Sequence, residues 1–423
     1  MQEVTHKVRA GLVHINFRRP QDNEEFDEFV LLAESAGIEP ALTINSSRTS
    51  PDARYCIGSG KLQELAQQVA AQQLELLVFN HALSPAQERN IEKAVRCRVL
   101  DRVGLILDIF ARRARSHEGQ LQVELAQLQH LSTRLVRGWS HLERQKGGIG
   151  LRGPGETQLE TDRRLLGKRI KTINSRLGGV KSQRLQSRRL RKSSHIPQLS
   201  LVGYTNAGKS SLFNALSGAG VYVANKLFAT LDPTIRRVEL AHHSSMLLSD
   251  TVGFIRHIPP DLIESFHATL EEVRDADLLL HIIDSGADCQ LRIAEVNQVI
   301  ADLGAEDIPQ IIVYNKSDLL RDGTVPAIRR NGTTPAVWVS AKTGDGIEQL
   351  KQLIAERLRN DGFAHELKLP ATAGKLRASL FRHAQVTSEQ AVENGGWLMR
   401  IQAAPAVLAR LCRENGLNME QLL

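Results

Sequence analysis

The stretch that decides the fold reads Gly203-Tyr204-Thr205-Asn206-Ala207-Gly208-Lys209-Ser210. It matches the pattern GxxxxGK(S/T), whose glycines let main-chain N–H groups curl around phosphate oxygens. Lys209 would reach the β- and γ-phosphates of a nucleotide, and the Ser210 hydroxyl would bind Mg²⁺. We expect a strand over Leu199–Val202 and a helix over Ser211–Leu216, so that the positive end of this helix faces the anion. The alternative, a tight turn without a ligand, is disfavoured by the sequence that follows.

Another motif, which contains an aspartate, lies downstream of this loop. Asp250 ends the hydrophobic run Met246–Leu248 and is followed by Thr251-Val252-Gly253. An aspartate at such a strand end holds Mg²⁺, usually through water, and the Gly253 N–H can contact a γ-phosphate. Together with the loop at 203–210, this motif predicts a nucleoside triphosphate site.

Two further motifs indicate that the base is guanine. Asn315-Lys316-Ser317-Asp318 follows the apolar run Ile311–Tyr314, and ligands of open α/β sheets bind at such carboxyl ends. The Asp318 carboxylate would accept two parallel hydrogen bonds from N1–H and the 2-amino group of guanine, and adenine lacks this pair of donors. Lys316 can lay its stem along the base. Ser340-Ala341-Lys342 follows another strand and can offer main-chain N–H groups to guanine O6.

The pattern around these motifs predicts four parts. Residues 197–360 alternate strands and helices, which predicts an α/β domain with a mainly parallel sheet. Residues 1–110 predict a small α/β domain, in which Ser84 caps a helix that has Glu88 near the capping-box position. Residues 361–423 predict a small C-terminal α/β domain without recognisable chemistry.

Residues 111–196 predict a long helical hairpin. One helix is expected from Leu105 to Arg144 and a second from Glu156 to Arg191, weakened at Gly178-Gly179, with the glycine-rich loop Lys146–Gly155 between them. The stretch from Asp162 to Lys192 is strongly basic, because Asp162 is its one acidic residue and it contains twelve lysines and arginines: Arg163, Arg164, Lys168, Arg169, Lys171, Arg176, Lys181, Arg184, Arg188, Arg189, Arg191 and Lys192. Such a surface could neutralise RNA phosphates. The alternative is a solvated, charged coiled coil.

The whole chain carries a formal net charge of +7 and contains no run of eighteen apolar residues, so we expect no membrane span. The residues Met1–Arg9 lack the apolar segment of a secretory signal. We therefore expect a cytoplasmic protein, with a monomer as the favoured oligomeric state.

The order and spacing of the motifs resemble those of the five nucleotide motifs of translation-factor and Ras-like GTPases. In chain order these motifs are Gly203–Ser210, Phe228–Asp232, Asp250–Gly253, Asn315–Asp318 and Ser340–Lys342. By this resemblance, Phe228-Ala229-Thr230-Leu231-Asp232 is the first switch region, and Thr230 joins Ser210 in binding Mg²⁺ in the triphosphate state. Thr234 is the competing candidate. Lys209, Thr230 and Gly253 are then the residues expected to act in GTP hydrolysis.

Hydrolysis is expected to be slow without a partner. Ras-type enzymes orient the attacking water with a glutamine directly after the glycine of the third motif, and Phe254 stands at this place. Arg256 and His257 lie nearby in the second switch. In several GTPases that resemble this chain, an asparagine at the place of Asn206 helps to hold K⁺, which leads to the hypothesis that K⁺ accelerates turnover.

The resemblance narrows to the HflX family of ribosome-associated GTPases. It rests on Leu121–Leu128, the glycine-rich loop, Gly155–Arg164, Gly203–Asn206 and Asp250–Arg256, and it is only loose after residue 361. It implies binding to the large ribosomal subunit and ribosomal RNA, stimulation of GTP hydrolysis by the ribosome, and dissociation or rescue of ribosomes under stress. The alternatives are a ribosome-assembly GTPase and a stress-regulatory GTPase that acts on a protein partner.

Overall fold

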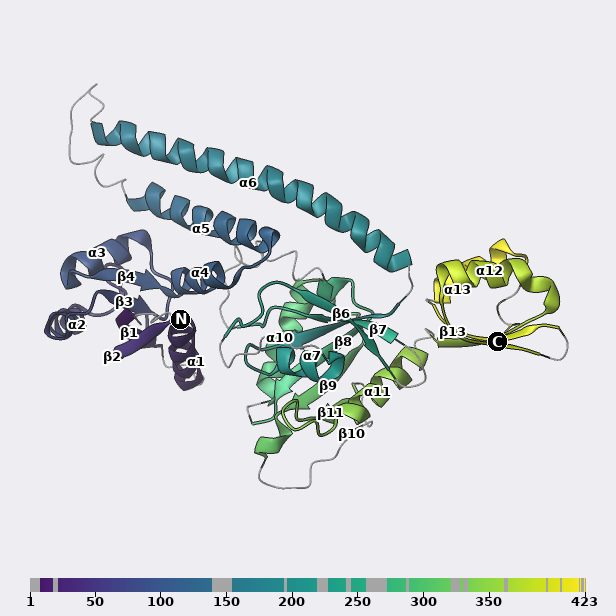
Figure 1. Ribbon diagram of the computed structural model, residues 1–423. Coiled ribbons are helices and arrows are strands. Elements are labelled where there is room, and N and C mark those ends of the chain that lie inside the picture. The colour runs from purple at the N-terminus through teal and green to yellow at the C-terminus, as the bar shows by residue number, and fades with distance from the viewer. Residues whose placement is uncertain are drawn as a thin grey trace, which may run out of the picture. The chain divides into compact units, whose positions relative to one another are not determined.

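The computed structural model describes residues 8–17, 22–138, 154–193, 196–218, 227–240, 245–255, 272–286, 289–320, 328–329, 334–360, 364–392, 395–403, 405–417, 419 and 422 (Figure 1). The chain divides into two compact units. The first holds the described residues up to Gly179 together with 227–231, and the second holds the remaining ones from Val180 onward. Trp139, Arg144, the glycine-rich loop up to Gly153, Arg256 and His257 lie outside the described residues.

The first unit begins with a four-stranded parallel sheet in the order β2-β1-β3-β4. Its strands are β1 (Val8–Asn16), β2 (Ile38–Ser47), β3 (Leu76–Phe79) and β4 (Arg98–Asp101). Its helices are α1 (Asp22–Ser35), α2 (Ser59–Gln72), α3 (Pro85–Val95) and α4 (Arg102–Arg113). Right-handed crossovers place α2 with α3 on one face and α1 with α4 on the other, so β1 is buried continuously from Ala10 to Ile15. This is the α/β arrangement predicted for the N-terminal part.

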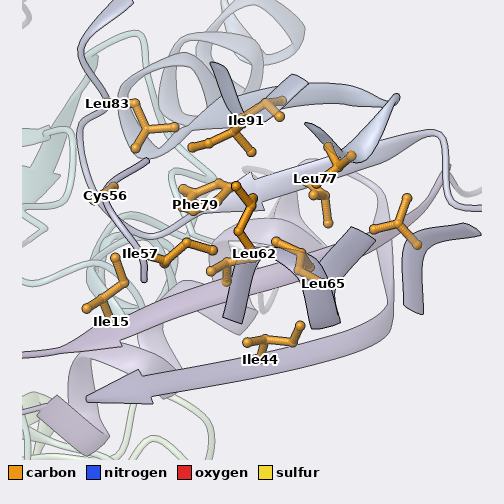
Figure 2. Packing of buried hydrophobic residues seen from close by; sticks show 14 of the residues in the cluster. Ile15, Ile44, Cys56, Ile57, Leu62, Leu65, Leu77, Phe79, Leu83 and Ile91 are labelled. Carbon is orange, nitrogen blue, oxygen red and sulfur yellow. The ribbon is translucent and has the colours of Figure 1, made fainter. Parts of the chain in front are cut away.

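The core between the sheet and the α2–α3 pair is apolar. Figure 2 shows Leu62 and Leu65 of α2 and Ile91 of α3 gathered in one cluster with Ile15 and Phe79 of the sheet. Leu65, Ile91, Ile15 and Phe79 are fully buried. Each such side chain contributes about 1.5–3 kcal/mol through its removal from water.

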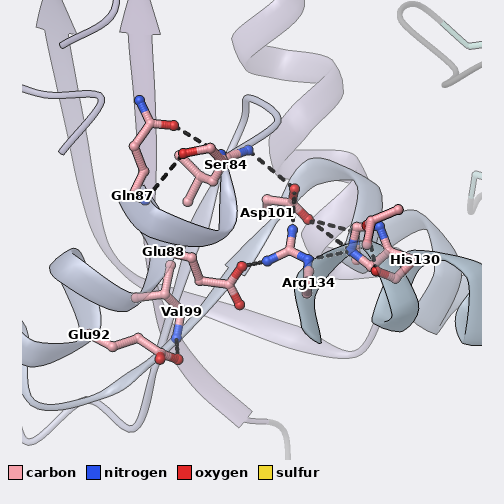
Figure 3. A network of polar contacts seen from close by, with 11 residues as sticks. Ser84, Gln87, Glu88, Glu92, Val99, Asp101, His130 and Arg134 are labelled. Atoms are coloured by element: carbon pink, nitrogen blue, oxygen red, sulfur yellow. Dashed lines mark hydrogen bonds and ion pairs between the residues drawn. The ribbon is translucent and has the colours of Figure 1, made fainter. Parts of the chain in front are cut away.

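The cap of α3 differs in one residue from the prediction. The Ser84 hydroxyl accepts a hydrogen bond from the N–H of Gln87 at 3.2 Å, and the Gln87 side chain accepts one from the N–H of Ser84 at 2.9 Å (Figure 3). The box needs the third helical residue, which is Gln87; Glu88, which the sequence placed near the capping-box position, is the residue after it. Glu88 instead pairs with Arg134 (Figure 3).

The first helix of the hairpin is fastened to this domain by a buried acid. Asp101 caps α4 by accepting from the N–H of Gly104 at 2.8 Å, and it also accepts from Arg134 at 2.8 Å. Arg134 belongs to α5 (His117–Gly138), and its Nε donates to His130 at 2.9 Å (Figure 3). Burial raises the pKa of Asp101 and lowers the pKa of Arg134 from their ordinary values.

The hairpin differs from the predicted one in two places. The single helix expected over Leu105–Arg144 is wrong: α4 ends at Arg113, Ala114 is extended, and Ser116 caps the start of α5 through the N–H of Gly119 at 2.9 Å. The second helix, α6 (Pro154–Ser193), runs unbroken through Gly178-Gly179.

The two helices of the hairpin pack through a short apolar seam. Its buried members are Leu121 and Leu125 of α5 and Ile173 of α6. Leu131, further along α5, is 48% exposed. An ion pair between Glu124 and Arg169 at 2.6 Å adds a polar contact at its border.

The second unit contains a seven-stranded sheet in the order β10-β11-β9-β8-β5-β7-β6. The inner strands β5 (Gln198–Gly203), β7 (Ser245–Asp250), β8 (Leu278–Asp284), β9 (Gln310–Asn315) and β11 (Ala336–Trp338) are parallel. The edge strands β6 (Thr234–Glu239) and β10 (Ile328–Arg329) run antiparallel to their neighbours. The helices α7 (Lys209–Ser217), α10 (Cys289–Asp302) and α11 (Ile347–Asn360) accompany the sheet. The predicted mainly parallel α/β fold is confirmed.

The C-terminal part is a three-stranded antiparallel sheet with two helices. The strands β12 (Ala364–Leu369), β13 (Gln385–Ala391) and β14 (Trp397–Gln402) pair in the order β12-β14-β13. Helices α12 (Gly374–His383) and α13 (Pro405–Glu414) cover one face (Figure 1). Ser245 of β7 connects to this part, since its N–H donates to Gln402 at 3.1 Å and its hydroxyl donates to Gln385 at 2.9 Å.

Within the described ranges, no helix is both long enough and apolar enough to cross a membrane.

Candidate functional site

The loop Gly203–Ser210 lies where the sequence placed it, between the end of β5 and the start of α7. Gly208 has a φ of +91°, and a Cβ atom there would lie 2.1 Å from Asn315 Nδ2. Only glycine fits this position, because a side chain would collide with Asn315 and would strain the backbone. Asn206 also has a positive φ of +61° and is exposed, whereas Ala207 is buried. The loop therefore has the tight curvature that phosphate binding needs.

Lys209 is buried beneath its own loop. Its Nζ donates to the main-chain oxygens of Gly203 at 3.0 Å and Tyr204 at 2.7 Å. Burial lowers the pKa of Lys209 to about 8, and the nearby carboxylate of Asp250 offsets part of this decrease. The ammonium thus rests on neutral carbonyls, and a phosphate would give it a stronger partner.

The side chains of Ser210 and Asp250 bring together two oxygen groups of the kind that bind metal ions. The Ser210 hydroxyl donates to Asp250 Oδ2 at 2.7 Å, and Asp250 is fully buried at the end of β7. Mg²⁺ prefers oxygen ligands and keeps several waters, so it needs only one or two protein groups beside substrate phosphates. The chemistry and the spacing of these two side chains fit such an ion.

The third motif lies directly against the phosphate loop. Phe254 donates its N–H to Gly203 O at 3.1 Å and accepts from Thr205 N at 2.8 Å, which makes a short parallel bridge between the two segments. A Cβ atom at Gly253 would lie 2.8 Å from both Lys209 Nζ and Thr205 Cα. There is therefore no room for a side chain at this position. Thr251 donates its hydroxyl to Leu201 O at 2.5 Å, and Val252 is buried. Sequence reasoning foresaw the motif but missed this main-chain bridge, which leaves no side-chain signal.

Asn315 joins the fourth motif to the first and fifth. Its Nδ2 donates to Ala207 O at 2.9 Å, and its Oδ1 accepts from Ala341 N at 3.0 Å. Asp318 accepts a hydrogen bond from the Ser340 hydroxyl at 2.6 Å, and Ser317 donates its N–H to Val339 O at 3.1 Å. The structure therefore brings the three motifs at 203–210, 315–318 and 340–342 together, with Lys342 exposed beside them.

Lys316 has a partner that sequence reasoning did not single out. Its Nζ lies 2.8 Å from Oδ2 of Asp284, the last residue of β8. A signal was available, because Asp284 is a polar residue at the carboxyl end of a buried strand.

The first switch region divides between the two units. Phe228-Ala229-Thr230-Leu231 belongs to the first unit, where the Phe228 ring meets Phe110 edge-on at 4.6 Å and Leu227 N donates to Ser35 Oγ at 2.9 Å. Asp232 belongs to the second unit, and so does Thr234, which pairs with Asp250 in the β6–β7 register. The magnesium roles of Thr230 and its competitor Thr234 stay predictions.

Comparisons with known proteins cover most of the chain. Residues 23–111 match a family model described as the N-terminal part of a GTP-binding GTPase, residues 113–191 match its middle region, and residues 198–316 match a model described as a 50S ribosome-binding GTPase. The chain is 51% identical to the GTPase HflX of Escherichia coli (strain K12), over 98% of each chain. It is 47% identical to the GTPase HflX of Caldanaerobacter subterraneus, over 85% of this chain and 82% of that protein.

Among solved structures, a GTP-binding protein from the archaeon Sulfolobus solfataricus in complex with GDP is similar to this chain at 24% identity, with a TM-score of 0.45. The match covers 82% of this chain and 98% of that one.

Proposed function

Because the chain belongs to the HflX family of GTPases, we propose that its cycle of GTP binding and hydrolysis controls binding to the large ribosomal subunit and the dissociation of ribosomes under stress. That the protein binds and hydrolyses GTP follows from the family itself. The observation that supports the ribosomal part is the joining of this site, in one chain, to a long helix with a basic surface. The match of residues 198–316 to a 50S ribosome-binding GTPase model agrees with it.

In the proposed complex, each motif has one task. Lys209 leaves its carbonyl partners for the β- and γ-phosphates, and the N–H of Gly253 contacts the γ-phosphate. Ser210 and Thr230 would hold Mg²⁺, and Asp250 would interact with it through water; the ion would supply positive charge to neutralise the phosphates. At the other end, Asp318 accepts the N1–H and 2-amino hydrogens of guanine.

Intrinsic hydrolysis is proposed to be slow. Phe254 is 4% exposed and offers no polar side-chain atom, so it cannot orient the attacking water. The ribosome then stimulates turnover by ordering the switch regions, and the triphosphate form in return binds the ribosome better. Asn206 is exposed at the loop and available to K⁺. Equal hydrolysis rates in Na⁺ and K⁺ buffers would exclude that part of the proposal.

The basic face of α6 is proposed to bind ribosomal RNA. Arg163, Arg164, Lys168, Lys171 and Arg176 are all exposed, and exposed cations release counterions when they meet phosphates. RNA helices are recognised largely by shape and phosphate contacts, so such a surface needs no aromatic side chains. The protein would act as a monomer in the cytoplasm.

The decisive experiment measures GTP hydrolysis with and without purified large subunits, and light scattering of intact ribosomes with GTP. We expect stimulation and a fall in scattering. The variant Arg164→Glu with Lys168→Glu should bind large subunits more weakly, with a shallower dependence on salt. A matched control, Lys375→Glu with Arg382→Glu, changes two exposed cations of α12 and should bind normally.

The outcomes separate the alternatives. Subunit binding without a fall in scattering would favour a ribosome-assembly factor. No subunit binding, together with unchanged GTP hydrolysis, would favour a regulatory GTPase that acts on a protein partner.

A further inference from the structure

Asp284 stands at the carboxyl end of β8, directly beside the guanine motif. In the β8–β9 register it is paired with Asn315, and Ser285 N donates to Asn315 O at 2.9 Å. The two oxygens of its carboxylate have separate partners. Oδ1 accepts from the N–H of Gly286 at 3.1 Å, and Oδ2 accepts from Lys316 Nζ at 2.8 Å.

We propose that Asp284 is a positioning residue for guanine recognition, which holds the side chain of Lys316 where the base lies against it. The inference rests on the proposed nucleotide site, and it adds a residue from outside the five nucleotide motifs. Asp284 itself touches no nucleotide in this arrangement; it acts through the lysine.

The physical reason is the flexibility of lysine. A lysine side chain has four rotatable carbon–carbon bonds and carries about 2 kcal/mol of rotamer entropy, so a free Lys316 would have to be ordered by each arriving nucleotide. In the structure both of its ends are fixed. The backbone is held at a φ of +62° and is followed by the hydrogen bond from Ser317 N to Val339 O, while the ammonium is held by Asp284.

Fixing both ends leaves the methylene stem between them with few conformations. An apolar stem of this kind can cover the face of a flat base without losing further entropy, which is how preorganisation raises affinity. The ion pair is also partly wet, since its side chains are 27% and 22% exposed. Its contribution is therefore moderate, larger than that of a fully exposed pair.

The test uses Asp284→Asn, which keeps an oxygen acceptor for Gly286 N and removes the charge that holds Lys316. We expect the affinity for GDP, measured by isothermal titration calorimetry on the full chain, to fall about five- to tenfold. The affinity of Lys316→Ala for GDP should fall at least as much. Because Asp284 acts through the lysine, adding Asp284→Asn to Lys316→Ala should cause no further loss.

A merely structural role would give a different pattern. In that case Asp284→Asn would lower affinity equally in both backgrounds and would lower the melting temperature of the nucleotide-free protein, which would overturn the proposal. Unchanged GDP affinity of Asp284→Asn would overturn it as well. The matched control is Glu348→Gln, which removes the acid of the surface pair with Lys351 in the same unit and should leave affinity unchanged.

Failure of the site itself is recognisable separately. If the wild-type chain bound no GDP, or if Asp318→Asn bound it normally, the proposed nucleotide site would be wrong. If Asp318→Asn lost affinity for GDP as expected and Asp284→Asn did not, only the role of Asp284 would be refuted.

Discussion

Nucleotide binding should take up a proton, because of the way Lys209 is held. In the free protein this lysine is buried, and the burial lowers its pKa to about 8 from an ordinary value of 10.5. Around pH 8 a substantial share of the molecules therefore carry a neutral amine. A bound β-phosphate gives the ammonium an anionic partner and restores its pKa, so the amine must be protonated when the nucleotide binds.

The size of the effect follows from the two pKa values. If binding restores the ordinary pKa, about 0.1 proton is taken up at pH 7, about 0.5 at pH 8 and about 0.75 at pH 8.5. The sign is fixed, since the bound state holds more protons than the free state between the two values. Affinity must then fall as the pH rises, by about fourfold between pH 7 and pH 8.5.

Calorimetry can measure this uptake directly. GDP is titrated into the protein in two buffers of different ionisation enthalpy, and the difference in heat gives the number of protons. Arg is always protonated, so Lys209→Arg should remove the uptake, whereas Lys316→Ala should keep it because Lys209 is untouched. Proton uptake that stays at zero from pH 7 to pH 8.5 in the wild type would refute this account of Lys209.

Three further results are expected. Gly253→Ala should raise the dissociation constant for GTP about tenfold or more and that for GDP far less. A Cβ atom there would lie 2.8 Å from Lys209 Nζ and Thr205 Cα, where the main-chain N–H of residue 253 is proposed to contact the γ-phosphate. Phe213→Ala should lower the free energy of unfolding by about 3–5 kcal/mol in urea denaturation, because Phe213 of α7 is fully buried, whereas Leu319→Ala, at a side chain that is 65% exposed, should change it by less than about 0.5 kcal/mol. Gln402→Ala should lower the free energy of unfolding by about 1–3 kcal/mol and speed proteolysis of the C-terminal part, because it leaves the buried N–H of Ser245 without its acceptor. An unchanged digestion pattern would show that this contact does not hold the C-terminal part in place.

The nucleotide motifs were predictable because their chemistry is local. The loop at 203–210 needs glycine and lysine at fixed spacing, and the strands that carry the other motifs are apolar runs that end in a polar residue. The structure places these motifs at carboxyl ends of β5, β7 and β9 as expected. The edge strands β6 and β10 were missed, since Thr234–Glu239 is polar and only half-buried and therefore lacks the apolar run.

The helix boundaries failed for a different reason. No proline or glycine stands at Ala114–Ser116, and the polar stretch Arg115–Gln120 that follows was included in one long predicted helix. The break lies where α4, which is buried in the N-terminal domain, ends and Ser116 caps a new helix; this helix, α5, contacts α3 and α4 and also packs on α6. Gly178-Gly179 was expected to weaken α6, but an exposed glycine costs a helix only about 1 kcal/mol.

The contact between Phe228 and Phe110 was not predictable at all. The two residues are far apart in sequence, and no sequence pattern around either of them predicts that they pair. Such long-range packing depends on the shape of a folded surface, which hydrophobic periodicity does not contain.

One carbonyl connects the resting position of Lys209 with the third motif. The main-chain oxygen of Gly203 accepts from Lys209 Nζ at 3.0 Å and from Phe254 N at 3.1 Å, so both of its lone pairs are used. When the ammonium moves to a phosphate, this oxygen keeps its bond from Phe254, and the departure of the lysine does not leave it without a donor. The lysine can therefore exchange a neutral acceptor for a charged one at little cost in hydrogen bonds, and charge-assisted bonds are about twice as strong as neutral ones. The free energy of nucleotide binding at this position is then mainly electrostatic, which is why it should respond to the protonation of one amine.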